Sequence, residues 1–114
     1  MIFEIPYKHP PLSRKKDART CYERDKFAIL ARFAFGTVEI PKRVAVVVEI
    51  SLRSRHGGPR LMNIAAGVLK TLNESGLLFG NRVCRLKITR GKRKENKTRI
   101  IVHDYDKNSR DRAV

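Results

Sequence analysis

Three arginines surround a pair of glycines in the stretch RSRHGGPR, and these residue types are suited to binding phosphate. Arg53, Arg55 and Arg60 carry planar guanidinium groups, which donate paired hydrogen bonds to phosphate oxygens. Gly57 and Gly58 give the backbone between them conformational freedom. The stretch directly follows a valine-rich segment, so the arginines are expected at the carboxyl end of a strand. We therefore predict a phosphate-binding loop here. The competing interpretation is that these arginines are exposed to solvent on a loop without binding a ligand.

A second basic segment runs from residue 85 to residue 99 and contains a single acid, Glu95. Natural surfaces usually intersperse both signs of charge, so this excess favours a hairpin that follows a phosphate backbone, in DNA or in a structured RNA. A smaller run at residues 14–16 is equally compatible with a solvated loop. Aromatic residues do not alternate with the bases, which argues against stacking of single-stranded nucleotides. The basic residues of these segments are Arg14, Lys15, Lys16, Arg85, Lys87, Arg90, Lys92, Arg93, Lys94, Lys97 and Arg99.

Residues that could hold a metal ion are scattered. His9, His56 and His103 show no zinc-type spacing. Cys21 and Cys84 stand alone, without CxxC spacing, and reduced thiols are expected, with a disulfide left open. The sequence therefore predicts no metal centre and no cofactor.

The overall charge points to a polyanionic partner. Lys and Arg number 26 against 11 acidic residues, a formal net charge of +15, in a chain of 114 residues of which 41% are hydrophobic. That composition fits one globular domain whose positive charge matches nucleic acid. An anionic membrane is the weaker alternative, because no basic amphipathic helix, lipidation motif, signal peptide or apolar run of about 20 residues is present. We expect a cytoplasmic protein.

Periodicity predicts alternating strands and helices. The segment MIFEIP reads as a strand that ends at Pro6, and a helix is expected from Asp17, its N-cap, to about Phe35, with Gly36 as its stop. The face of this helix that should be buried comprises Cys21, Tyr22, Phe27, Leu30, Ala31 and Ala34. Phe33, Phe35 and Phe79 are expected in the core or in a dimer contact.

The centre of the chain predicts a buried strand followed by a helix. The β-branched run from Val44 to Ile50 is typical of a central strand covered on both faces. The next helix should end at Gly76 and bury one face, made of Leu61, Ile64, Ala65, Val68, Leu69 and Leu72.

The last third predicts two strands. In VCRLKITR the residues Cys84, Leu86 and Ile88 should be buried, while the alternate positions form a basic face. TRIIVHDY then returns as the final strand. The order β-α-β-α-β-β predicts an α/β (α+β) fold in which helices pack on a small mixed sheet. Residues 1–106 should form a single domain, and residues 107–114 a polar, frayed tail.

This order of elements resembles the RusA family of Holliday-junction resolvases. The features that carry the resemblance are the Pro-rich loop after the first strand, the valine-rich strand, the Arg/Gly loop, a helix ending in GLL and the basic end. It covers nearly the whole chain and is sharpest from Val44 to Tyr105. The resemblance implies a small homodimeric protein of phage or bacterial origin that acts on four-way DNA junctions, in recombination and repair, with Mg²⁺.

The acidic signature of that family is missing here. The family has two acids, separated by one residue and followed by Asn, at the start of the second helix; RLMN puts Arg60 and Met62 in their place and keeps Asn63. Further acids should follow that helix, where Gly80 and Asn81 stand instead. Hydrolysis of a phosphodiester with Mg²⁺ needs anionic oxygen ligands. The resemblance therefore implies a scaffold without its catalytic acids.

We thus predict a RusA-like protein that binds the phosphate backbone of branched or duplex DNA and has lost cleavage. The residues expected to contact nucleic acid are Arg14, Lys15, Lys16, Arg53, Arg55, Arg60, Asn63, Lys87, Arg90, Lys92, Arg93 and Lys94. Two alternatives stay open. One is an active magnesium-dependent junction endonuclease, either with the family's acids at other positions of this chain or with ligands recruited from Glu49 and Glu74. The other is a basic RNA-binding or ribosome-associated domain.

Overall fold

The computed structural model describes residues 1–10, 18–53, 58–92 and 95–106 of the chain. Within these ranges the elements follow one another in the order predicted from the sequence. They are β1 (Ile2–Ile5), α1 (Ala18–Phe35), β2 (Val44–Ser51), α2 (Gly58–Glu74), a short 3₁₀ helix η1 (Gly80–Arg82), β3 (Val83–Arg90) and β4 (Lys97–Asp104). The predicted N-cap Asp17 and the predicted tail, residues 107–114, lie outside the described residues.

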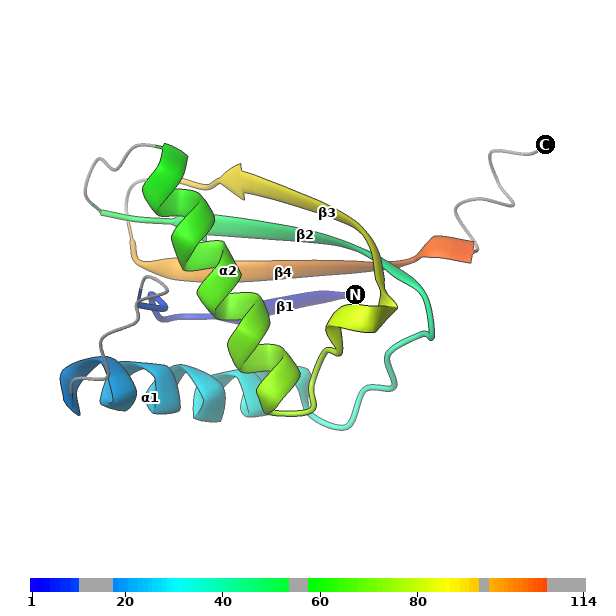
Figure 1. Ribbon diagram of the computed structural model, residues 1–114, viewed down its shortest axis with the longest axis horizontal. Coiled ribbons are helices and arrows are strands. Elements are labelled where there is room, and N and C mark those ends of the chain that lie inside the picture. The colour runs from blue at the N-terminus through cyan, green and yellow to red at the C-terminus, as the bar shows by residue number, and fades with distance from the viewer. Residues whose placement is uncertain (11–17, 54–57, 93–94, 107–114) are drawn as a thin grey trace.

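The described strands form one mixed sheet in the order β1-β4-β2-β3. β4 pairs antiparallel with both β1 and β2, whereas β2 and β3 are parallel. The expected hairpin between the last two strands is therefore wrong, because β2 lies between β3 and β4 (Figure 1). The connection crosses the end of β2 so closely that a side chain at Gly91 would collide with Ser51. This crossing explains a glycine at the position where the chain leaves β3.

Both helices pack on the same face of the sheet (Figure 1). β2 alternates accordingly: Val44, Val46, Val48 and Ile50 are buried, while the residues between them, up to Glu49, are partly exposed. The prediction that β2 is central is confirmed, but the prediction that both of its faces are covered is wrong. A valine-rich strand can tolerate one partly exposed face, because β-branched residues favour the extended conformation whether or not a second layer covers them.

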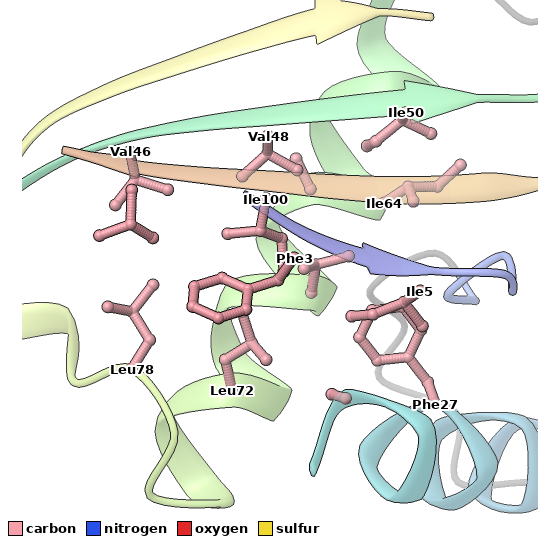
Figure 2. Close-up of a cluster of buried hydrophobic side chains, with 14 of the residues drawn as sticks. Phe3, Ile5, Phe27, Val46, Val48, Ile50, Ile64, Leu72, Leu78 and Ile100 are labelled. Atoms are coloured by element: carbon pink, nitrogen blue, oxygen red, sulfur yellow. The ribbon is translucent and has the colours of Figure 1, made fainter. Parts of the chain in front are cut away.

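The core lies between this face of the sheet and the two helices. Figure 2 shows Phe3 and Ile5 of β1, Val46 and Val48 of β2 and Ile100 of β4 directed at Ile64 and Leu72 of α2 and Phe27 of α1. The rings of Phe3 and Phe35 stack, with centroids 4.0 Å apart, where the end of α1 meets β1.

The buried face of α2 was predicted more accurately than that of α1. In α2 the predicted face is buried apart from the partly buried Leu69, and Gly76 has the positive φ (72°) of a helix-terminating glycine. In α1, Phe27 and Ala31 are buried, but Tyr22 is 64% exposed and lies outside the core. Gly36 ends α1 with a φ of 58°.

β3 is an outer strand of the sheet, and its side chains are less buried than predicted. Leu86 and Ile88 align with Val46 and Val48, so they do face the helix layer. Leu86 is nevertheless 42% exposed, and Cys84 is also exposed, because β3 is an outer strand of the sheet. Both cysteines are free thiols. Among the described residues no helix is long and apolar enough to cross a membrane.

Candidate functional site

A cleft of about 810 Å³ opens at the end of the sheet where β1, β2 and β3 terminate. We call this end the cleft edge, and the end where the same strands begin the opposite edge. The cleft edge is on the left in Figure 1, and the amino-terminal ends of α1 and α2 lie there too. Four basic side chains line the cleft, each from a different segment. The described residues around it are Pro6, Tyr7, Lys8, Pro10, Arg19, Thr20, Glu23, Arg53, Arg60, Glu95 and Asn96.

Arg53 and Arg60 are the two predicted phosphate ligands that the fold brings together. Arg53 follows β2, and its backbone N–H donates to the side-chain oxygen of Asn96 at 3.1 Å, which ties the end of β2 to the segment before β4. Arg60 stands in the first turn of α2. Both side chains are exposed, and neither forms an ion pair with another described residue. Two guanidinium groups in one cleft, without an acidic partner in the described part of the chain, favour an anion.

The helix ends add to the positive potential of the cleft. Free backbone N–H groups at a helix N-terminus carry a partial positive charge of about half a unit. The first turns of α1 and α2 contribute Arg19 and Arg60 to the lining, and neither turn contains an acidic residue in the described part of the chain. Side chains and backbone therefore act in the same direction.

Sequence reasoning missed Lys8, Arg19, Glu23 and Glu95 as lining residues. They come from segments that are distant in sequence, and no local pattern signals that they meet. Each carboxylate has a basic partner: Glu23 pairs with Arg19 at 3.4 Å, and Glu95 with Lys97 at 3.6 Å.

The wall formed by residues 6–10 is anchored through a buried histidine. His9 makes hydrogen bonds of 2.6 Å with the Thr71 hydroxyl and 2.7 Å with the Pro10 carbonyl, and its ring packs edge-on against Phe27. A side chain at Gly67 would collide with this ring, so the glycine makes room for it. Burial lowers the pKa of His9, which favours the neutral ring at neutral pH. His9 is thus a structural residue that fixes the Pro-rich segment on α2.

The other predicted nucleic-acid contacts lie outside the cleft. Arg90 and Lys92 are at the same edge of the sheet, next to the segment that contributes Glu95. Lys87 lies on the open face of β3, aligned with Val47, and Asn63 is exposed on α2. Arg14, Lys15, Lys16, Arg55, Arg93 and Lys94 lie outside the described residues.

Two bases of the predicted basic hairpin are engaged within the sheet. Arg99 donates two hydrogen bonds to one oxygen of Glu4, at 3.0 and 2.6 Å, and Lys97 pairs with the same oxygen at 3.2 Å. The hydrogen bond from Arg99, and then that from Lys97, lowers the pKa of Glu4. These cations are therefore less available for phosphate than a count of charges suggests.

The positions at which the RusA family has acids lie at opposite ends of α2. Arg60 and Met62 are in its first turns, while Gly80 and Asn81 follow its last turn. The 17 residues of α2 span about 25 Å. Within one chain, these two segments are therefore too far apart to border one site. The Gly80 N–H donates instead to the Asn73 side chain at 2.9 Å, a contact that closes the turn.

Glu49 and Glu74 do not converge either. Glu49 points to the open face of the sheet, since its neighbours Val48 and Ile50 are buried under the helices. Glu74 is the last residue of α2, in the helix layer and away from the cleft. Among the described residues no group of three or more His, Cys, Asp or Glu side chains is placed to hold a metal ion.

The opposite edge of the sheet also carries arginines, but they are bound to the protein. Arg43 pairs with Asp106 at 3.0 Å and lies over the ring of Tyr105, 5.1 Å from its centroid. Arg82 donates to the Ile40 carbonyl at 3.2 Å and lies 5.6 Å from the centroid of the Phe79 ring. These side chains join the segments that enter and leave the sheet.

No protein-family model matches the sequence, and a search of curated proteins finds no match either.

Proposed function

We propose that this protein binds the phosphate backbone of duplex or branched DNA, with the cleft between the helix N-termini as the centre of the interface. The observation that supports this most is that Arg53 and Arg60 line the same cleft, and that neither guanidinium group has an acidic partner among the described residues. Arginine pairs of this kind suit phosphate oxygens. Arg90 and Lys92 extend the basic surface along the same edge.

The net charge of +15 supports the same proposal. Cations that replace condensed counterions of a nucleic acid gain affinity from the release of those ions. Backbone contacts carry no sequence information, so the proposed binding is independent of sequence. The likeness to RusA-type resolvases adds a preference for branched junctions and a setting in the cytoplasm of a prokaryotic or phage-infected cell.

We further propose that the protein does not cleave DNA. Arg60 and Met62 offer no anionic oxygen, and the two carboxylates in the cleft, Glu23 and Glu95, are each held by a neighbouring base. Magnesium-dependent hydrolysis needs such oxygens free to bind the ion and to offset charge on the reacting phosphate. The wide separation of Glu49 and Glu74 disfavours a displaced ligand set.

The test is a competition experiment at one fixed salt concentration. A labelled four-way junction is bound to the protein and displaced with unlabelled junction, duplex DNA or structured RNA, followed by fluorescence anisotropy. We expect junction and duplex to displace the label at lower concentrations than RNA, and affinity to fall steeply with added salt. Stronger displacement by RNA would favour an RNA-binding domain instead.

Cleavage is tested on the same junction. The protein is incubated with it at equal concentration, with Mg²⁺ and separately with Mn²⁺, and the strands are resolved on a denaturing gel. We expect intact strands. Cuts at symmetric positions across the junction would show an active resolvase and refute the proposed loss of chemistry.

A further inference from the structure

The cleft has an apolar wall that the proposed function does not use. Pro6, Tyr7 and Pro10, from the segment after β1, line the cleft together with the arginines. Tyr7 is half-buried, and the ammonium group of Lys26 lies over its ring, 5.0 Å from the centroid. A cation over one face of an aromatic ring leaves the other face for a second planar group. The fold thus adds a single aromatic ring to a basic cleft, although the two are distant in sequence.

The segment that carries this ring is held in place before any ligand binds. The Tyr7 N–H donates to the Ile5 carbonyl at 2.7 Å, and the Tyr7 carbonyl accepts from the Thr98 hydroxyl at 3.1 Å. His9, two residues further on, is fixed on α2 by its hydrogen bond with Thr71. The backbone around Tyr7 is therefore anchored to both β4 and α2, so binding against this wall requires little ordering of the protein.

The size of the cleft selects among the parts of a DNA molecule. Its volume of about 810 Å³ lies in the range of about 300–1,000 Å³ that is typical of sites for a small ligand. A length of duplex is too large for such a site and can contact only its rim, whereas a single nucleotide can enter. Inside a duplex both faces of each base are covered by its neighbours, so only a nucleotide that has left the stack offers a free face.

We propose that the cleft holds one unpaired nucleotide of a branched or interrupted duplex, with its base against the Tyr7 ring and its phosphate at Arg53 and Arg60. This role of the cleft rests on the proposed function and names the part of the DNA that enters the site. The duplex beside that nucleotide then contacts Arg90 and Lys92 along the same edge. Stacking on an aromatic ring tolerates every base, because each has a π-face, so the preference is for an unpaired position and not for a sequence.

The test compares two DNA probes by fluorescence anisotropy at one salt concentration. One probe is a fully paired duplex, and the other is the same duplex with one extra, unpaired nucleotide in its middle. We expect the second probe to bind at least about fivefold more tightly, which is the lower end of what one stacked base contributes.

Substitutions of Tyr7 separate stacking from the altered shape of the second probe. Tyr7→Leu keeps an apolar contact with the core but removes the aromatic face, so the ratio of the two dissociation constants should fall below about twofold. Tyr7→Phe retains the ring and should preserve the ratio. Tyr105→Leu is the matched control, because Tyr105 also lies under a cation, Arg43 at 5.1 Å, but at the opposite edge; it should leave the ratio unchanged. Circular dichroism verifies the fold of each variant.

A photocrosslink locates the base. With 5-iodouracil at the unpaired position, irradiation of the complex should join the DNA to the peptide that contains Tyr7, identified by mass spectrometry. Equal affinity for the two probes, a ratio that Tyr7→Leu leaves intact, or crosslinks confined to other peptides would overturn the nucleotide site and leave the proposed function in place. Failure of both probes to bind would refute the proposed function and the nucleotide site together.

Discussion

The two edges of the sheet both carry arginines, yet they use them differently. At the edge with the cleft, Arg53 and Arg60 have no acidic partner among the described residues. At the opposite edge, Arg43 is paired with Asp106, and Arg82 with the Ile40 carbonyl and the Phe79 ring. A cation whose hydrogen bonds are satisfied within the protein stabilises the fold, whereas an unpaired one remains able to bind a ligand. Charge count alone does not distinguish the two edges.

The largest expected effect comes from removing Arg53 and Arg60, the two arginines of the cleft for which the described residues supply no acidic partner. The double variant Arg53→Ala/Arg60→Ala should weaken binding to duplex DNA about a hundredfold, if each charge-assisted hydrogen bond is worth about 1.4 kcal/mol. The slope of log Kd against log salt concentration should fall by about 1.8, because each phosphate that the protein no longer neutralises lowers it by roughly 0.9. Fluorescence anisotropy over a range of salt concentrations measures both quantities.

Lys42→Ala/Lys70→Ala is the control for that experiment. It removes the same charge from exposed positions outside the cleft, so affinity should change by less than about threefold. An equal decrease of affinity in both double variants would mean that net charge, and not the cleft, determines binding.

The second prediction concerns the opposite edge. Arg82→Ala should lower the free energy of unfolding by about 1–2 kcal/mol, because it leaves the Ile40 carbonyl without its donor and uncovers the Phe79 ring. Its affinity for DNA should stay within about twofold of the wild type. Urea denaturation measures the first quantity. If Arg82→Ala impairs binding while the fold keeps its stability, the division of roles between the two edges is wrong.

The third prediction concerns the buried anchor of the cleft wall. Burial, assisted by Arg24, lowers the pKa of His9 below the 6.5 of an unfolded histidine, against the opposing effects of the Pro10 carbonyl and Glu23. Above pH 6.5 the ring is neutral in both states, and its contribution to stability is complete. As the pH falls from 6.5 toward the lowered folded pKa, the unfolded chain takes up the proton first, so stability decreases. The slope is at most about 1.4 kcal/mol per pH unit for one proton.

Urea denaturation between pH 7.5 and about 5 tests this dependence. The carboxylate Glu4 also has a lowered pKa, but its contribution is lost below its unfolded value of 4.5, outside this range. His9→Gln should flatten the pH dependence even if the variant is less stable, while His103→Gln, at an exposed position, should leave it unchanged. An unaltered slope in His9→Gln would show that another group titrates.

Local sequence patterns predicted the helices and strands well, but they did not predict which strands lie next to each other in the sheet. The period of α2 identified its buried face, and Gly36 and Gly76 marked the helix ends, because both signals are contained in a few consecutive residues. Strand order is a long-range property. The sequence places β4 directly after β3, but β4 pairs with β2 and β1, and nothing within either strand encodes that choice.

The candidate site illustrates the same limit. Arg53 and Arg60 could be predicted because they stand close together beside two glycines in the sequence. Lys8 and Arg19 could not, since they reach the cleft through the packing of α1 and the His9 anchor. Tyr22 was assigned to the core because it lies near the edge of a broad helical face, where a helical pattern alone does not settle burial.

The smallest expected effect separates the two edges most directly. Glu4→Gln releases Arg99, and leaves Lys97 with Glu95 as its partner, near the start of β4 beside the cleft, while Asp106→Asn releases Arg43 at the opposite edge. Each variant raises the net charge by one, so their comparison isolates position. Affinity for duplex DNA should rise about twofold in Glu4→Gln and remain unchanged in Asp106→Asn, since a freed cation acts on phosphates within about 8 Å at physiological salt. Parallel anisotropy titrations measure this difference. Equal gains in both variants would mean that DNA senses the charge of the whole molecule and that the cleft has no privileged role.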